Sequence, residues 1–181
     1  MTKENTQFAI LGLLTTGCNT GYSIKQMMDG SLTHFWKISY GQIYPILKKL
    51  VDQGYASVRE TPQEGKPDKK EYQITDRGRD ALGKWLEHPI NELETTKNEL
   101  LLKLFFSRHQ GSQVTIGHVR QYKQKLEERY SIYHTIKSQI SACYIGQEDA
   151  KYWIITLNYG LATTKAAIEW CGETISKLKE E

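Results

Sequence analysis

The sequence predicts a mainly α-helical protein with two domains: short helices and one β-hairpin at residues 6–88, followed by long helices at residues 91–179. Two observations predict it. In the first half, three stretches with apolar residues at helical spacing precede two short runs of alternating residues. In the second half, apolar residues recur in steps of three and four over long distances. With 39% hydrophobic and 25% charged residues, the 181-residue chain is able to bury a core.

The first two helices are short. Apolar side chains fill most positions of residues 8–14, and Gly17 is a natural stop for this helix. Asn19 or Thr20 then caps a second helix, which Gly30 closes. A tight turn therefore joins the two helices.

The third helix begins at Ser39, because Gln42 follows three residues later in a capping-box arrangement. Apolar residues then recur at spacings of three and four until Gly54 ends the helix. Pro45 lies inside it and lacks a backbone N–H, so we expect a kink or a loosened first turn. The opposite side is rich in hydrogen-bond donors: Tyr40, Gln42, Tyr44, Lys48, Lys49 and Gln53.

A change from helical spacing to alternation predicts a β-hairpin with strands at residues 55–60 and 70–74. The turn between them contains Gly65, two prolines and the cation Lys66. Thr75 then caps a fourth helix, which His88-Pro89 ends. Its expected buried face consists of Ala81, Leu82, Trp85 and Leu86.

Three helices, a hairpin and a fourth helix in this order make a winged helix-turn-helix. This architecture suits double-stranded DNA, because the major groove admits one α-helix while the hairpin reaches phosphates. Gln42 is able to pair with an adenine edge or to cap its helix, and it cannot do both fully. The net charge of +3 is too small to establish a polyanionic partner by itself.

Five short motifs occur in a fixed order between Phe8 and Leu86: Gly21-Tyr22, the run GQIYPIL from Gly41 to Leu47, Gly54-Tyr55, Gly65-Lys66-Pro67, and the run YQITDRG from Tyr72 to Gly78. In this combination the sequence resembles the PadR family of bacterial transcription regulators. The resemblance also accounts for Pro45, since members of that family carry a Tyr-Pro at this place.

The resemblance implies a dimeric winged-helix protein, usually a repressor, in which the third helix and the wing hold an operator. The acidic residues Asp68 and Glu71 flank the wing lysines and weaken the case for phosphate contacts there. The DNA-binding residues that the resemblance nominates are Ser39, Tyr40, Gln42, Tyr44 and Lys48 in the helix, and Lys66, Lys69 and Lys70 in the wing.

Two long helices follow in the second half. One apolar seam runs through residues 119–140 and a second through residues 153–178, and residues 142–147 turn the chain between them. Residues 98–106 are too apolar for a surface helix, so we expect them to pack under the other two. Longer PadR-type regulators, including those resembling virulence activators, end in a similar helical region that clasps a partner subunit.

A narrow apolar stripe needs a partner to bury it, so the second seam is expected to join two subunits. A homodimer then reads two half-sites of a palindrome about one helical turn apart, roughly 34 Å. The residues expected at this contact are Trp153, Leu157, Leu161, Ile168 and Ile175.

A pocket for a small, flat, hydrophobic effector is one interpretation of Trp85, Tyr122 and Trp153, and the family resemblance suggests phenolic or drug-like compounds. Release of the operator by such an effector is part of the expected function. Core packing is the alternative interpretation, and the spacing of these aromatic residues favours it.

No pattern in the sequence points to an enzyme, a cofactor or a metal. The cysteines Cys18, Cys143 and Cys171 are odd in number and widely spaced, and the five histidines share no metal-ligand spacing. The chain has no apolar run of 18 residues and no signal pattern at its start, so we expect a cytoplasmic protein without membrane contact. The alternative function is a winged-helix adaptor that docks other proteins without binding DNA.

Overall fold

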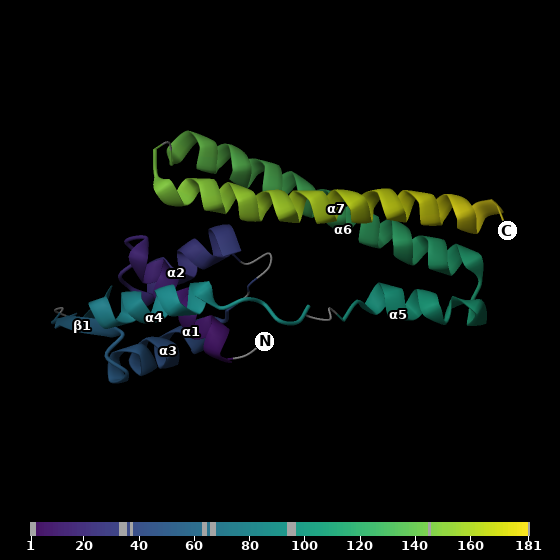
Figure 1. Cartoon of the computed structure of the whole chain (residues 1–181). Helices are drawn as coiled ribbons and strands as arrows, with labels where there is room; N and C mark the ends of the chain where they lie inside the picture. The colour runs from purple at the N-terminus through teal and green to yellow at the C-terminus, as the bar shows by residue number, and fades with distance from the viewer. Residues whose placement is uncertain are drawn as a thin grey trace. The chain divides into compact units, whose positions relative to one another are not determined.

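A computed structural model describes residues 3–32, 36, 38–62, 65, 68–93, 97–144 and 146–180. The chain divides into two compact units, Met1–Leu93 and Glu94–Glu181. The first unit contains α1 (Lys3–Thr15), α2 (Gly21–Met27), a π-helical turn (Met28–Leu32), α3 (Tyr40–Asp52), β1 (Ala56–Thr61), β2 (Lys69–Ile74) and α4 (Asp76–Glu87) (Figure 1). The second contains α5 (Glu99–Phe105), a 3-10 turn (Ser107–His109), α6 (Ser112–Cys143) and α7 (Glu148–Glu180).

The predicted signals at the ends of the first helices are confirmed except at Gly30. Gly17 and Gly54 follow α1 and α3 with φ angles of 88° and 73°, a conformation that glycine adopts without strain. Thr20, not Asn19, caps α2, because its hydroxyl accepts the Ser23 N–H at 3.0 Å. The prediction that Gly30 closes α2 was wrong, since helical backbone continues through Met28–Leu32. One glycine costs a helix only about 1 kcal/mol, and burial of the Met28 side chain offsets that cost.

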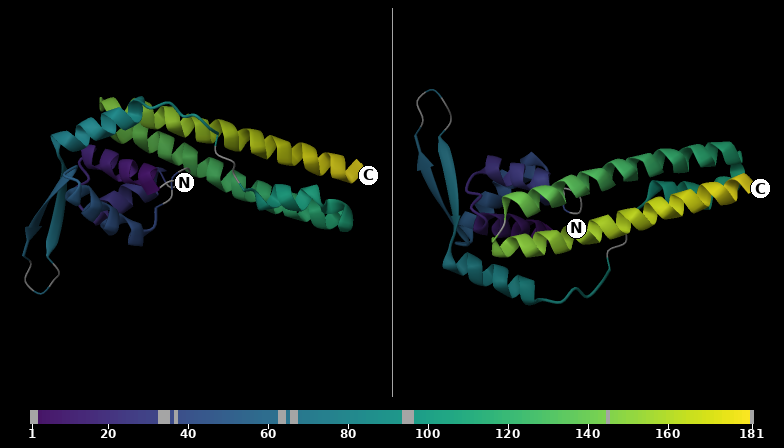
Figure 2. Two further views of the ribbon diagram at one scale, coloured as in Figure 1. Left: turned by 60° about the horizontal axis from the view of Figure 1, so that its bottom comes forward. Right: turned by 90° about the horizontal axis from the view of Figure 1, so that it is seen from above.

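The core of the first unit lies between α1, α2 and α3. Both strands contribute only their inner ends to it, through Ala56, Tyr72 and Ile74. The strands pair antiparallel from Ala56 opposite Ile74 to Thr61 opposite Lys69. The rest of the hairpin therefore extends beyond the helices of its own unit as a wing (Figure 2). The fully buried helix residues of this core are Ile10, Leu11, Ile24, Ile43, Leu47 and Leu50.

The motif Thr75 to Gly78 fixes α4 to the start of the hairpin. The Thr75 hydroxyl accepts the Gly78 N–H at 3.1 Å and donates to the Gly54 carbonyl oxygen at 2.7 Å. The Arg77 guanidinium lies 5.5 Å from the centroid of the Tyr55 ring. A Cβ atom on Gly78 would come within 2.1 Å of the Tyr55 carbonyl oxygen, so only glycine fits this position.

The buried face predicted for α4 is only partly correct. Trp85 stacks on Phe8 of α1 with ring centroids 5.0 Å apart, and Leu82 packs against the core. Leu86, by contrast, is 67% exposed, so its predicted burial was wrong. The reason is geometric: consecutive helix residues point about 100° apart, and α4 meets α1 along one edge.

Pro45 does not interrupt α3. The helix is continuous from Tyr40 to Asp52, so the proline does not end it, and the Gln42 N–H donates to the Ser39 carbonyl oxygen at 3.0 Å in the first turn. The expected kink or loosened turn at Pro45 stays a prediction. Both Pro45 and Gly41, whose carbonyl loses its helical donor, lie on the exposed side of α3. Because an exposed carbonyl is accessible to water, the cost of the proline is lower here than in a buried helix.

The second unit is built on an antiparallel hairpin of α6 and α7, which lie side by side in Figures 1 and 2. The two seams predicted from the spacing are confirmed, and they pack against each other within one chain. Gly146, with a φ of 84°, lies in the turn between the helices. On α6 the buried residues recur every seven positions, and the interlocking sets are Val119, Leu126, Tyr133 and Ile140 on α6 with Leu157, Leu161, Thr164 and Cys171 on α7.

The predicted packing of residues 98–106 under the two long helices was mostly wrong. Asn98 caps α5 by accepting the N–H groups of Leu100 and Leu101. Only Leu100 is buried, and Phe105 is 82% exposed. Because α5 has seven residues and meets α6 along one edge, it buries one of its own faces and leaves the others open.

Over the described ranges, no helix is both long and apolar enough to cross a membrane.

Candidate nucleic-acid interface

The candidate interface is centred on the outward face of α3. Ile43, Leu47 and Leu50 anchor the inner face of the helix in the core with no exposed surface. The sequence-predicted residues Ser39, Tyr40, Gln42, Tyr44 and Lys48 all lie on the exposed side of the helix. Tyr40 and Tyr44 are 45% and 44% exposed, large fractions for aromatic side chains.

The structure decides how Gln42 uses its side chain. Its Oε1 atom accepts the Ser39 backbone N–H at 2.9 Å and the Ser39 hydroxyl at 3.0 Å. The amide oxygen therefore serves the helix cap, which leaves the side-chain N–H groups as donors to other partners. Pairing with both edge atoms of an adenine would break this cap.

A groove of about 820 Å³ separates α3 from the wing. Tyr44 and Lys48 line it from α3, Tyr22 lines it from α2, and Lys69 and Lys70 line it from β2. The structure thus brings two of the five predicted helix residues and two of the three predicted wing lysines to one groove, whereas Ser39, Tyr40 and Gln42 do not line it. The third, Lys66, lies outside the described residues.

Both described wing lysines are already paired with carboxylates. Lys69 Nζ lies 2.8 Å from Glu71 Oε1, and Lys70 Nζ lies 2.8 Å from Glu60 Oε1. The hydrogen bond with Glu60 raises the pKa of Lys70, and the bond with Lys69 lowers the pKa of Glu71. Because Glu60, Lys69 and Lys70 are exposed and Glu71 is only half-buried, these pairs hold together weakly, and a phosphate is able to replace either glutamate.

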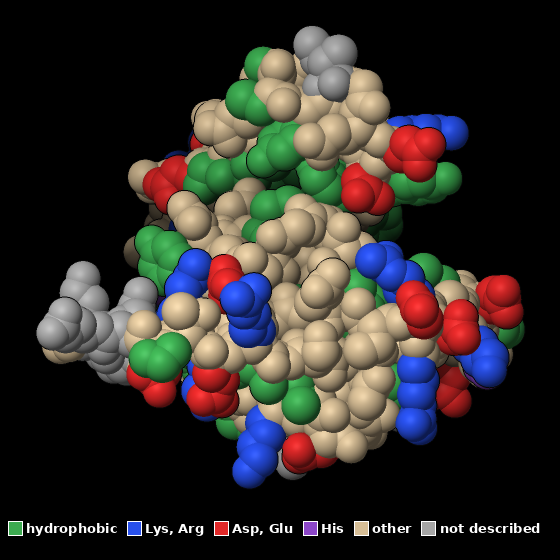
Figure 3. Space-filling view, turned by 90° about the vertical axis from the view of Figure 1, so that its left-hand side faces the viewer, with side chains coloured by type: hydrophobic (Ala, Val, Ile, Leu, Met, Phe, Trp, Pro, Cys, Tyr) green, Lys and Arg blue, Asp and Glu red, His purple; other side chains and the backbone are tan. Residues whose placement is uncertain are grey.

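Charge on the face drawn in Figure 3 is mixed rather than gathered into one basic patch. On the face drawn in Figure 3, blue and red side chains alternate. This pattern agrees with the small net charge of +3. Recognition at this interface therefore depends on the placement of a few groups more than on a broad positive field.

Comparison with known proteins places this arrangement in a family. Residues 10–84, which contain α3 and the wing, match the model of the Transcriptional regulator PadR-like family. Residues 96–179 match the model named Virulence activator alpha C-term. The negative transcriptional regulator PadR of Bacillus subtilis (strain 168) is 30% identical over 179 residues, which cover 97% of this chain and 98% of that protein. The chain belongs to the PadR-like family of transcriptional regulators.

Two solved structures show how far the PadR likeness extends. The crystal structure of Bacillus subtilis PadR in complex with operator DNA has a TM-score of 0.82 at 30% identity and covers 96% of this chain and 98% of that one. The structure of the same PadR in complex with p-coumaric acid has a TM-score of 0.81 at 27% identity, and the match covers 100% of this chain and 99% of that one. The winged helix-turn-helix and the long C-terminal helices are thus the fold of a PadR-family regulator, and this family is one of regulators, not of enzymes.

The three aromatic residues considered for an effector pocket do not gather at one place within a unit. Trp85 belongs to the first unit and stacks on Phe8. Trp153 packs edge to face on Tyr144, with ring centroids 5.2 Å apart, at the turn between α6 and α7. Tyr122 lies about 30 Å from that turn along α6, because some twenty residues separate them at 1.5 Å each.

Sequence reasoning missed the residues that surround Tyr122. Its hydroxyl accepts a hydrogen bond from Asn98 Nδ2 at 3.1 Å, and Arg129 and Thr164 line the same pocket. These residues come from α5, α6 and α7, so no local spacing links them. The described residues contain no cluster of three or more His, Cys, Asp or Glu side chains arranged to hold a metal.

Proposed function

We propose that this PadR-family protein is a sequence-specific, DNA-binding repressor that acts as a homodimer on a palindromic operator. The observation that carries the proposal is the exposed polar face of α3 beside the wing groove. The operator complex of the Bacillus subtilis relative, which is similar over nearly the whole chain, supports DNA as the partner. The description of that relative as a negative regulator supports repression.

Lys48→Ala is expected to weaken binding of a fragment of the protein's own promoter about fivefold to tenfold and to lower the salt dependence of log K by about one. The reason is that Lys48 is exposed on α3 and has no ion-pair partner in the described part of the chain. Fluorescence anisotropy at several salt concentrations measures both quantities.

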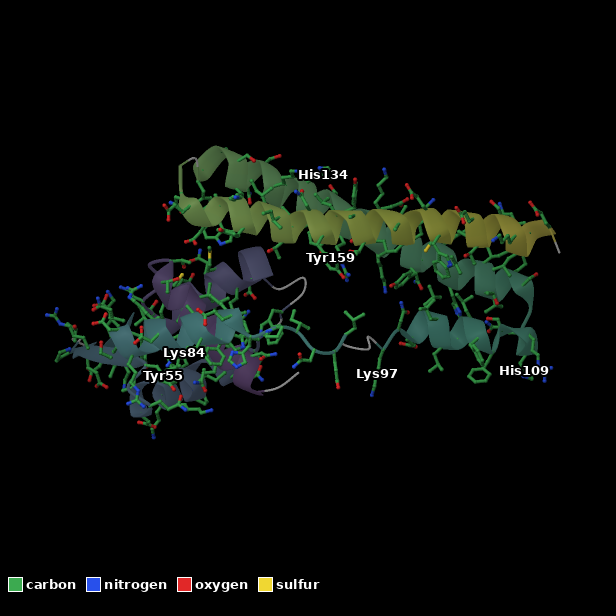
Figure 4. All side chains as sticks on the ribbon, viewed as in Figure 1. Tyr55, Lys84, Lys97, His109, His134 and Tyr159 are labelled. Atoms are coloured by element: carbon green, nitrogen blue, oxygen red, sulfur yellow. The ribbon has the colours of Figure 1, made fainter. Side chains whose placement is uncertain are left out.

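Lys84→Ala is the matched control, because it removes the same charge from α4, outside the groove (Figure 4). Equal losses of promoter affinity in the two variants would show that α3 is not part of the interface. The adaptor function would be favoured instead if the wild-type protein did not bind promoter DNA, or if its affinity for that DNA did not fall as the salt concentration rises.

A second surface supports the homodimer. The seam residues Trp153, Leu157, Leu161, Ile168 and Ile175 pack against α6 of their own chain, so their predicted role between subunits stays a prediction. The opposite side of α7 carries a further stripe in steps of three and four, on which Tyr159 is 72% exposed (Figure 4). We propose that a second copy covers this stripe, because monomers rarely leave so much aligned apolar surface open. Its residues are Tyr152, Ile155, Tyr159, Ala162, Ala166 and Trp170.

Ile155→Glu is expected to convert the dimer to a monomer while leaving the helix content unchanged. A carboxylate within the stripe would lose its water when the second copy binds, whereas in the monomer it stays exposed. Sedimentation velocity reports the mass and circular dichroism the fold. Asn158→Glu is the control, since Asn158 contacts Lys137 of α6 at 3.0 Å and glutamate preserves that contact. If the Ile155→Glu protein were still a dimer, this face of α7 would not be the contact between the two copies.

We propose further that a small aromatic carboxylate binds beside Tyr122 and releases the operator. The pocket there measures about 500 Å³, within the range of small-molecule sites. Leu126 and Thr164 form its buried floor, and the Tyr122 hydroxyl keeps its proton for a ligand because it accepts from Asn98. Arg129 has no ion-pair partner among the described residues and is suited to a carboxylate. The p-coumaric acid complex of the Bacillus subtilis relative supports the class of compound.

Arg129→Gln is expected to raise the concentration of p-coumaric acid needed to release promoter DNA by at least about tenfold, because a charge-assisted hydrogen bond is lost. Arg120→Gln, at an exposed position of the same helix, is the control and keeps the wild-type response. Titration of the acid into the protein–DNA complex measures the response. Identical midpoints for both variants would place the effector elsewhere.

A further inference from the structure

Gly21, the first residue of α2, contacts the ring of Tyr44 on α3. A Cβ atom added at Gly21 would lie 2.7 Å from Tyr44 Cζ and 2.9 Å from both Cε1 and the hydroxyl oxygen. Carbon atoms in ordinary contact lie about 3.5–4.0 Å apart, so no other residue fits without movement. Gly21 is buried and does not have a positive φ, so its backbone conformation suits any amino acid. The position requires space for the ring, not freedom of the backbone.

Tyr44 is also held from a second side. The Tyr40 ring lies one turn earlier on α3, with ring centroids 5.9 Å apart. A side-chain hydrogen bond with Tyr40, together with burial, raises the pKa of Tyr44. The Tyr44 ring is thus fixed between α2 and Tyr40, while 44% of the residue stays open toward the groove.

This contact sets the position of one ring on the outward face of α3. The ring separates the first turn of α2 from the exposed side of α3, on which Tyr40 and Lys48 also lie. A methyl group at Gly21 has to displace the ring by roughly 1 Å to reach ordinary contact distance, and the groove that Tyr44 lines leaves room for this movement. Hydrogen bonds to base edges tolerate a few tenths of an ångström, so a shift of this size breaks them.

We propose that Gly21 is a positioning residue for DNA recognition: its missing side chain leaves space for the Tyr44 ring against α2 and so sets where this ring lies when α3 meets the operator. The inference rests on the proposed function. It assigns to Gly21 an effect on specificity, since phosphate contacts tolerate small shifts better than base contacts do.

Gly21→Ala tests the proposal in the full-length protein, with the native promoter fragment and a scrambled fragment of equal length as probes. The expected result is a loss of promoter affinity of at least about tenfold, the typical effect of one lost base contact, with unchanged affinity for the scrambled fragment. Alanine is the better helix former, so the melting temperature is not expected to fall by more than a few degrees. Gly12→Ala in α1, where a Cβ atom would meet nothing within 4 Å, is the matched control and keeps wild-type affinity.

A double-mutant cycle separates positioning from a purely structural effect. In a Tyr44→Ala background no ring remains to be displaced, so adding Gly21→Ala is expected to change promoter affinity by no more than about twofold. This background also removes the clash if Gly21→Ala alone folds poorly. Additive losses, or equal losses on both fragments, would overturn the proposal.

The remaining outcomes separate the inference from the function on which it rests. Wild-type affinity in Gly21→Ala would overturn the role of Gly21 and leave the DNA-binding function standing. A wild-type protein that does not distinguish its promoter from the scrambled fragment would overturn both.

Discussion

Leu161→Asp is expected to unfold the α6–α7 hairpin at temperatures where the wild-type chain is folded. Leu161 is buried in a cluster with Tyr133, Ile140 and Leu157. The substitution removes the buried side chain and places an unpaired carboxylate in its position, so the expected loss of stability is about 4 kcal/mol. Thermal unfolding followed by circular dichroism measures the loss, which should be large because most of the second unit is helical.

Ser176→Asp is the control for this experiment, because it adds the same charge at an exposed position of α7. Its melting temperature is expected to stay within a few degrees of the wild type. Leu161→Asp should also abolish dimerisation and tight promoter binding as a consequence of unfolding. Ile155→Glu, in contrast, should give a folded monomer. A stably folded Leu161→Asp protein would show that the seam does not hold the hairpin together.

Gly78→Ala is expected to destabilise the first unit by about 3 kcal/mol, which corresponds to a fall of the melting temperature by about 10 °C or more. The added Cβ atom would lie 2.1 Å from the Tyr55 carbonyl oxygen and 3.0 Å from Ile74 Cγ1. The carbonyl belongs to the backbone and already accepts the Thr75 N–H at 3.0 Å, so it cannot move without breaking that bond. Differential scanning calorimetry on the full-length chain measures the change.

Gly83→Ala provides a control of opposite sign in the same helix. A Cβ atom at Gly83 would meet nothing within 4 Å, and alanine favours helix over glycine by about 1 kcal/mol. A small rise of the melting temperature is therefore expected. If both alanine variants behaved alike, the close approach of α4 to Tyr55 would not limit residue 78.

The two seams of the second unit show where prediction from spacing stops. Periodicity identified the correct residues on each long helix, including Leu157 and Leu161, because residues three and four apart share a face. It did not show that α6 of the same chain covers that face. The open stripe around Tyr159 contains alanines among its aromatic residues and gives a weaker pattern than the seam, whose role between subunits stays a prediction.

In the candidate site, too, local sequence patterns predicted some features and missed others. The exposed residues of α3, the cap at Ser39 and the wing followed from local rules of helix spacing, capping and turns. The seat of Tyr44 on Gly21 and the pocket at Tyr122 did not, because each joins residues that are far apart in the sequence.

The sequence by itself determined the order of the elements and most of their ends, because caps, turn residues and apolar spacing act over a few neighbouring positions. Its five ordered motifs carried the resemblance to the family. Only the tertiary structure decided that Leu86 and most of α5 stay exposed, that the oxygen of Gln42 serves the cap, and that the α7 seam is covered within the chain. The physical reason is that a local pattern states which side chains share a face, whereas the surface that covers this face depends on where distant segments pack.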